Sequence, residues 1–382
     1  MAGTVNGELK VKKDWEIKKL GDVCEEIYAG GDKPALFSQE QTEDYKIPIY
    51  ANGITNDGLY GFTKEATEDR ECLTISARGT IGFVCVRNKP FVPIVRLIIL
   101  VPKQNVYIHY LKYYCQILSI SNTGSSIPQL TVPMIKTYSV MIPPLEEQKR
   151  IVKILDEKFA QLETIKTNAQ TNLQNAKDLF QSQLTKAFSN TTWEKKTIGD
   201  ICLLKSGNSS SNNSKPGNLP YVKVGDMTIN GNERTITTST LFVDYEENKK
   251  NIFPKGTVIF PKRGGAILTN KKRLTAVEIC CDLNIMGVIP TDKILSEFLY
   301  YYFIGIDFAE LCNGAAIPQI NNIDINPLTI SLPPLPEQKR IVKELDTLSE
   351  KVKALQNIYE QMLLDCEELK QSFLCKAFEG EL

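Results

Sequence analysis

The feature that most constrains this chain is an internal repeat. The segment Pro143–Asp156 (PPLEEQKRIVKILD) recurs as Pro333–Asp346 (PPLPEQKRIVKELD), and twelve of the fourteen positions are identical. Agreement of this extent does not arise by chance, so the chain contains two copies of one unit. Most of the sequence between the landmarks has diverged, which predicts one scaffold that presents two different surfaces.

Shorter landmarks keep the same order in both halves of the chain. The offset is 178 residues between Trp15 and Trp193 and 190 residues between Pro143 and Pro333, so the second half holds twelve additional residues between these points. The other matches are Leu184–Phe188 with Leu374–Phe378, Ile127–Leu130 with Ile317–Ile320, and Leu20–Asp22 with Ile198–Asp200.

The segment after each Pro-Pro motif is predicted to form a long helix. Its apolar residues alternate steps of four and three, which is the heptad spacing of a helix that packs against another helix. In the second copy this stripe is Ile341, Leu345, Leu348, Val352, Leu355, Tyr359, Met362, Cys366, Leu369 and Phe373. In the first copy it is Ile151, Leu155, Leu162, Ile165, Ala169, Ala176 and Leu179, with polar members Lys158, Asn172 and Gln183.

Each helix of about 42 residues would be roughly 60 Å long, and neither would be stable alone because its apolar stripe must be buried. We expect the two helices to pair antiparallel, which would hold the two domains at opposite ends of a rod. A coiled coil that serves only oligomerisation is the alternative.

The expected fold class is α+β, with two mixed α/β domains joined by two long helices that form an antiparallel coiled coil and a pseudo-twofold internal repeat. Short β-rich runs separated by Gly, Asn and Pro turns support the domain class. These runs are 73–76, 81–86, 92–101, 221–224 and 257–260, and helices are expected near 106–120 and 295–308. The expected boundaries are a flexible leader at 1–13, domains at 14–143 and 191–333, and helices at 144–190 and 334–382.

The composition limits the chemistry available to the chain. Hydrophobic residues make up 42% and charged residues 24%, as in globular proteins. No run of about 18 uncharged apolar residues occurs, so no membrane span is expected. The ten cysteines are scattered without a Cys-x-x-Cys pair, and His109 is the single histidine. We therefore expect reduced thiols, a cytoplasmic location, no zinc site and no cofactor.

The net charge is zero, but its distribution is uneven. From Cys72 to Leu145 there is no Asp or Glu, and from Asn248 to Val277 there is none either. Seven Lys and Arg residues lie in the first of these stretches and eight in the second. Two acid-free stretches in corresponding places predict basic surfaces that the neutral sum conceals.

The same stretches hold the candidate contacts to a nucleic acid. Ser76–Gly82 matches Pro261–Ile267, and each places an arginine beside a glycine, which suits a loop that must approach a duplex closely. A hairpin turn with an exposed arginine is the alternative. The candidates are Arg78, Gly79, Thr80, Lys262, Arg263 and Gly264, then Lys271, Lys272 and Arg273 as phosphate contacts, with Gln129 and Gln319 of the Ile-Pro-Gln motifs in second place.

Two Pro-Pro-Leu-x-Glu-Gln-x-x-Ile motifs, each followed by a heptad helix and each preceded by an Ile-Pro-Gln element, resemble the specificity subunit of type I restriction-modification systems. The motifs are Pro143–Ile151 and Pro333–Ile341, and the resemblance covers nearly the whole chain. It implies that 14–143 and 191–333 are target-recognition domains, each of which reads one half of a split, asymmetric site in double-stranded DNA. It also implies that the two helices form the spacer between them.

The resemblance further implies that two methyltransferase subunits dock on the spacer, that restriction or translocase subunits can join them, and that the chain itself has no catalytic role. The sequence holds no methyltransferase Asn-Pro-Pro-Tyr motif and no phosphate-binding loop of the Gly-Lys-Ser/Thr type. The candidate partner-binding residues are Gln148, Arg150, Gln338 and Arg340 in the repeated motif. A protein-binding scaffold without DNA, or an enzyme with an unfamiliar site, are the competing hypotheses.

Overall fold

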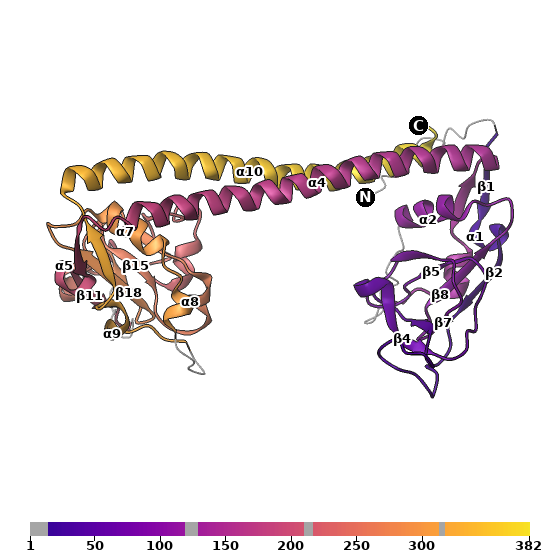
Figure 1. Ribbon diagram of the computed structural model, residues 1–382, viewed down its shortest axis with the longest axis horizontal. Coiled ribbons are helices and arrows are strands. Elements are labelled where there is room, and N and C mark those ends of the chain that lie inside the picture. Colours follow the sequence, from indigo (N-terminus) through magenta and orange to yellow (C-terminus); the bar gives the residue numbers. More distant parts are fainter. Residues whose placement is uncertain (1–13, 119–128, 210–216, 313–317) are drawn as a thin grey trace. The chain divides into compact units, whose positions relative to one another are not determined.

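The computed structural model describes residues 14–118, 129–209, 217–312 and 318–382 (Figure 1). The expected leader at 1–13 lies outside the described residues. The chain divides into two compact units, one made of Met1–Gln170 with Gln361–Leu382 and the other of Thr171–Glu360. Each unit contains one β-rich domain and a part of both long helices, α4 (Leu145–Phe188) and α10 (Leu335–Glu379).

In the first unit the domain has two main sheets and a short two-stranded pair. The four-stranded antiparallel sheet has the order β2-β8-β5-β6, formed by Cys24–Ala29, Ile98–Pro102, Cys72–Ile75 and Val84–Arg87. The three-stranded sheet has the order β4-β3-β7, formed by Leu59–Thr63, Ile47–Tyr50 and Val92–Pro93. The helical elements are α1 (Leu20–Val23), η1 (Thr55–Gly58), α2 (Ile108–Ile117) and α3 (Val132–Lys136).

The second unit repeats this order. Its larger sheet is β11-β18-β15-β16-β13, formed by Cys202–Ser206, Ile285–Pro290, Val258–Pro261, Arg273–Thr275 and Thr235–Ile236. Its smaller sheet is β14-β12-β17, formed by Leu241–Val243, Leu219–Val222 and Cys280–Cys281. The helical elements are α5 (Ile198–Ile201), η3 (Val224–Thr228), α6 (Tyr245–Asn248), η4 (Lys249–Asn251), η5 (Gly264–Thr269), α7 (Ser296–Ile304), α8 (Phe308–Leu311) and α9 (Asn322–Ile325).

A short strand pair closes each domain where its long helix begins. In the first domain β1 (Glu16–Lys19) runs antiparallel to β9 (Ser139–Ile142), and in the second β10 (Glu194–Thr197) runs antiparallel to β19 (Thr329–Leu332). The tryptophan landmark precedes the first strand of each pair, and the Pro-Pro motif follows the last. The repeated landmarks therefore mark where each domain opens and closes.

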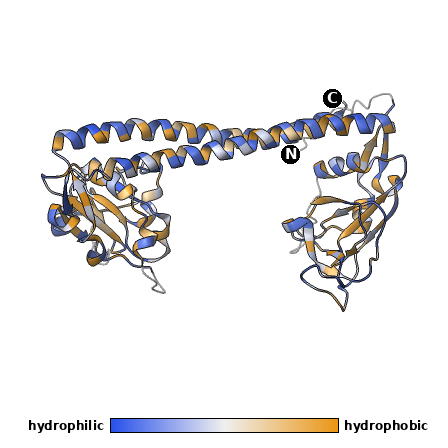
Figure 2. Cartoon of the chain, in the orientation of Figure 1, coloured by the Kyte–Doolittle hydropathy of each residue, from blue (hydrophilic) through white to orange (hydrophobic). Residues whose placement is uncertain are grey.

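A strand forms within or across each of the predicted β-rich runs, and one run contains two strands. The run 92–101 forms two strands, β7 and β8, because Val95 and Arg96 adopt positive φ angles of 53° and 60° and turn the chain between them. Hydrophobic residues concentrate along the strands, whereas hydrophobic and hydrophilic residues alternate along α4 and α10 (Figure 2). Among the described residues, no helix is long and apolar enough to cross a membrane.

The helices α4 and α10 pack antiparallel, as expected. In the first unit Ile151 and Leu155 of α4 share a core with Leu374 and Phe378 of α10, and further along Lys166 pairs with Glu367 at 2.6 Å. In the second unit Leu184 shares a core with Ile341 and Leu345. Between Leu155 and Ala176 the buried residues of α4 recur every seven positions, at Leu155, Leu162, Ala169 and Ala176.

The part of the predicted apolar stripe that is buried is narrower than the heptad pattern indicated. Ile165, Leu179, Leu355 and Leu369 are between 38% and 48% exposed, and Asn172 is exposed. Both apolar positions of a heptad usually pack into the partner helix, whereas here the second position lies at the edge of the contact at these residues. These edge residues are therefore open to solvent in each unit.

A buried glutamine fixes each domain to the start of its helix. The Gln148 side chain accepts a hydrogen bond from Tyr107 N at 2.7 Å and donates to the carbonyls of Asn105 and Pro143. Gln338 repeats all three bonds with Leu295, Lys293 and Pro333. Both side chains are fully buried. Their predicted role in partner binding is therefore revised: these amides hold the chain together and offer nothing to a partner.

The aspartate at the end of the repeated motif forms a second contact between each domain and its long helix. The Tyr113 hydroxyl donates to Asp156 Oδ1 at 2.5 Å, and the Tyr301 hydroxyl donates to Asp346 Oδ1 at 2.6 Å. Arg234 adds an ion pair to Asp346 in the second unit. The repeated motif is retained because its polar residues lock a domain to a helix.

We expect Gln338→Ala to lower the free energy of unfolding by about 2–4 kcal/mol, because three buried backbone groups lose their partner. Gln174→Ala is the matched control, since Gln174 is exposed and its amide contacts only Asp178 one turn away. Urea unfolding followed by circular dichroism measures both variants. Equal stability of the two variants would contradict the role assigned to Gln338.

Candidate nucleic-acid interface

An arginine and a glycine follow strand β5 in the first domain. Arg78 is exposed, and its Nη2 donates to Gln129 Oε1 at 2.9 Å. Gly79 has a φ angle of 68°. The backbone of the Ile-Pro-Gln segment lies alongside, since Leu130 N donates to Ala77 O at 2.9 Å.

The second domain builds the same arrangement after strand β15. Arg263 is exposed and forms an antiparallel backbone bridge with Gln319. Gly264 has a φ angle of 70°, and Ile320 N donates to Lys262 O at 2.9 Å, which is the counterpart of the Leu130 bond. Two motifs that lie far apart in the sequence therefore meet at one place in each domain.

The glycines in these loops are required by conformation. Their φ angles lie in the left-handed region that side chains with a Cβ rarely adopt. A Cβ placed on Gly79 or Gly264 would meet no atom of the described residues within 4 Å. Arg78 and Arg263 are exposed beside these glycines, so each can present its planar fork of donors to a phosphate or to a base edge.

Of the two remaining candidates, the Lys271 side chain is accessible to a phosphate, whereas the Thr80 hydroxyl is not. The Thr80 hydroxyl is buried without a hydrogen-bond partner among the described residues. Lys271 is half-buried, and no ion pair or hydrogen bond within the described parts of the chain engages its side chain.

Three of the predicted contacts have internal roles. Lys262 is 8% exposed and donates to Ser206 Oγ at 2.7 Å. Lys272 is 1% exposed, donates to Ile306 O at 2.7 Å and lies 4.2 Å from the centre of the Phe308 ring. The Arg273 guanidinium donates to the carbonyls of Met227 and Lys272. Because these cations are already engaged, we remove them from the proposed interface.

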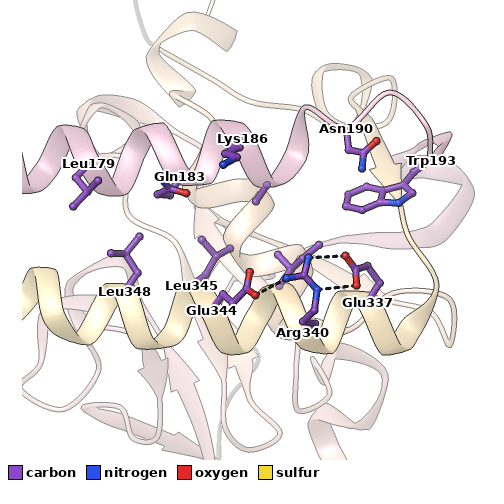
Figure 3. Close-up of a pocket in the computed structure, with 12 residues that line it drawn as sticks. Leu179, Gln183, Lys186, Asn190, Trp193, Glu337, Arg340, Glu344, Leu345 and Leu348 are labelled. Carbon is purple, nitrogen blue, oxygen red and sulfur yellow. Dashed lines mark hydrogen bonds and ion pairs between the residues drawn. The ribbon is translucent and has the colours of Figure 1, made fainter.

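A groove lies between α4 and α10 in the second unit (Figure 3). Its volume is about 550 Å³, and Leu179, Leu345, Leu348 and Trp193 contribute apolar surface to its lining. Charged residues also line it: Arg340 forms ion pairs with Glu337 and Glu344, and Lys186 lies on α4. A groove whose lining combines apolar and charged side chains in similar measure has the composition of a protein-binding surface.

Arg150 and Arg340 are the two predicted partner residues that remain accessible. Each lies three residues after a glutamate with which it pairs, Glu147 at 2.7 Å and Glu337 at 2.7 Å. Their side chains are 45% and 56% exposed.

Among the described residues, no cluster of three or more His, Cys, Asp or Glu side chains could hold a metal ion.

Comparison with known proteins decides the family. The sequence profile described as "Type I restriction modification DNA specificity domain" matches residues 12–173 and 190–363, one match for each half of the repeat. The chain belongs to this family.

Relatives in this family include a type I specificity subunit of Mycoplasma pneumoniae, which is 36% identical over 149 residues. That match covers 39% of this chain and 44% of the relative, so this chain aligns with less than half of the relative's length. The MjaIX specificity subunit of Methanocaldococcus jannaschii is 22% identical over 423 residues, covering 98% of this chain and 94% of the relative.

Solved structures show the same specificity-subunit fold. A chain from a structure of a type I R-M system has a TM-score of 0.79 at 19% identity and covers 98% of this chain and 100% of its own length. The HsdS subunit from Thermoanaerobacter tengcongensis has a TM-score of 0.62 at 20% identity, with 98% and 99% coverage. The predicted fold class is thereby confirmed.

One contributor to the arginine loop of this specificity-domain chain lacked a clear sequence signal. Asn52 Oδ1 accepts a hydrogen bond from Ala77 N at 2.7 Å, and its Nδ2 donates to Val95 O at 2.7 Å. Asn52 precedes Gly53, and such a pair indicates a turn rather than a contact with a segment far along the chain. Only the folded domain brings Asn52 beside Ala77 and Val95.

Because Lys272 is buried inside the domain, we expect the stability of the protein to depend on pH. Burial lowers the pKa of Lys272 to about 8 from an ordinary value of 10.5. Between these values the unfolded chain retains the proton and the folded chain does not, so the contribution of Lys272 to stability rises as pH increases through this window. We expect the stability of the wild type relative to Lys272→Met to increase from about pH 8 to about pH 10.

Denaturant unfolding of both proteins across this pH range is the measurement. Lys271→Met provides the control for removal of a neighbouring charge. A difference between wild type and Lys272→Met that does not change with pH would mean that solvent reaches the Lys272 amine.

Proposed function

We propose that this chain is the DNA-reading subunit of a type I restriction-modification assembly and that each domain reads one half of a bipartite, asymmetric site. The observation that carries the proposal is the duplicated loop, in which Arg78 with Gln129 and Arg263 with Gln319 occupy equivalent places in two otherwise divergent domains. Duplicated cations suit the phosphate backbone, which all DNA sequences share, whereas the divergent surroundings suit bases, which differ between half-sites.

The charge distribution supports the same proposal. Both loops lie within the acid-free stretches 72–145 and 248–277. Acidic side chains near the loops would repel phosphates, so their absence favours binding, and the affinity should fall as salt rises. Membership of the specificity-domain family gives no support to a protein-binding scaffold without a role in DNA recognition.

The antiparallel helices provide the spacer in this proposal. Since each domain is fixed to the start of its own helix by Gln148 or Gln338, the number of helical turns sets the gap that is permitted between the two half-sites. Shortening both helices by matched turns should therefore alter the gap.

Two methyltransferase subunits, with restriction or translocase subunits where the system has them, are the proposed partners in the cytoplasm. The chemistry of methyl transfer belongs to those partners, and this chain needs no cofactor for its part. The groove at Leu179 and Leu348, with Arg340 on its border, is the proposed contact for one methyltransferase subunit. Arg150 is placed equivalently in the other copy of the motif.

Exchange of residues 14–143 for the corresponding domain of a relative tests the division of labour. We expect the methylated sequence to change in one half and to keep its other half, because the second domain remains intact. Methylome sequencing of cells that express the exchanged chain with its methyltransferase subunits measures this. Change in both halves at once, or in neither, would oppose one reader per half-site.

The groove is tested by the double variant Leu179→Lys and Arg340→Glu, which places a charge on its apolar surface and reverses a charge on its border. We expect co-purification with the methyltransferase subunit to fall by at least about tenfold, as for residues at the centre of an interface. Leu203→Lys is the control, because Leu203 is 65% exposed on β11. Circular dichroism checks that the double variant folds, because Leu179 is 48% exposed but Arg340→Glu removes the ion pairs with Glu337 and Glu344. Unchanged co-purification would place the contact elsewhere.

A further inference from the structure

The two domains differ at the turn that lies beside the arginine loop. In the second domain strands β15 and β18 pair as far as Pro261 with Ile285, and Lys262 N then donates to Asn284 O at 2.8 Å. In the first domain the equivalent pairing of β5 with β8 ends one step earlier, at Ile75 with Ile98.

An asparagine side chain fills this gap in the first domain. The counterpart of Lys262 N is Ala77 N, which donates to Asn52 Oδ1 at 2.7 Å. The Asn52 amide then donates to Val95 O at 2.7 Å. Asn52 thus stands where the second domain has a direct backbone bond, and it links the Arg78 loop to the turn at Val95–Arg96.

The turn itself has an uncommon backbone. Val95 and Arg96 both have positive φ angles, whereas their counterparts Leu283 and Asn284 do not. A β-branched residue seldom adopts this conformation because its side chain crowds the backbone. Backbone bonds from Val95 N to Gly31 O at 2.9 Å and from Arg96 N to Gly30 O at 3.1 Å hold it in place.

This conformation leaves Arg96 free for a ligand. The Arg96 side chain is exposed and, within the described parts of the chain, forms no hydrogen bond or ion pair. Val95 beside it is 47% exposed, and Ile54, two residues after Asn52, is 58% exposed. An exposed guanidinium that follows an exposed valine, on a turn that Asn52 links to the residue before Arg78, fits a base edge, where donors and methyl groups are read together.

We propose that Arg96 is a specificity-determining residue of the first domain, that it contacts the O6 and N7 atoms of a guanine in the major groove, and that Asn52 is its positioning residue. The proposal rests on the function proposed above and deepens it. A phosphate contact would serve both half-sites equally and is supplied in duplicate by Arg78 and Arg263. The Arg96 turn exists in one domain only, which is what recognition of one half-site requires.

The test uses the full chain expressed with its methyltransferase subunits, and it compares Arg96→Ala and Arg96→Lys with the wild type by methylome sequencing and DNA titration. We expect both variants to lose discrimination for a G·C pair at one position of one half-site by about 5- to 150-fold, while the other half-site is unchanged. Lysine should not restore it, because its single charge lacks the planar fork. Lys89→Ala is the control. Lys89 is an exposed cation of the same acid-free stretch, and it lies just after strand β6, outside the Val95–Arg96 turn.

Asn52→Ala separates positioning from contact. We expect it to reduce discrimination at the same base position while the affinity for unrelated DNA stays at the wild-type level.

Two outcomes would overturn the assignment. If Arg96→Ala weakens binding to every DNA sequence by the same factor and leaves discrimination unchanged, Arg96 contacts a phosphate. If Arg96→Ala retains the complete methylated sequence, Arg96 contacts no base. In either case a bipartite methylated sequence in the wild type would leave the function proposed above intact, whereas its absence would count against that function itself.

Discussion

The buried glutamine at the start of each long helix is the contact on which the rest of the structure depends. Gln148 and Gln338 each join three backbone groups from the domain and from the Pro-Pro turn, with no solvent exposure. An unsatisfied amide at this depth is costly, so each domain is fixed to its own helix in one orientation. The tyrosine–aspartate pairs at Asp156 and Asp346 add a second point of attachment on the same helix.

On that fixed scaffold, the duplication separates what is shared from what is free to vary. The residue before each arginine keeps one backbone bond, from Leu130 N to Ala77 O in the first domain and from Ile320 N to Lys262 O in the second, although most surrounding residues differ. The adjacent turn does not keep its geometry: an asparagine side chain in one domain replaces a backbone bond in the other. A constant element beside a variable one is what two readers of one polymer need, because the backbone of DNA is uniform and its bases are not.

The helices combine a narrow contact with an open edge. Small residues such as Ala169 and Ala176 occupy the buried positions, while Leu179 and Leu369 are almost half exposed. Under the proposed function these helices also receive another subunit, and the exposed leucines supply apolar surface for it. In the second unit the exposed Leu179 lines the groove that also contains Arg340 and its ion-pair partners Glu337 and Glu344.

The sequence alone determined the duplication and the two long helices, because repeats and heptad spacing are local patterns. It predicted that the helices pair antiparallel, but the contacts between them come from the tertiary structure. The sequence also identified the two arginine–glycine loops. Tertiary structure alone decided which cations are free. Lys262, Lys272 and Arg273 resemble their neighbours in sequence, yet burial and internal acceptors engage them. The bond from Arg78 to Gln129 and the bridge made by Asn52 join residues 51 and 25 positions apart, and no local pattern encodes contacts at that separation.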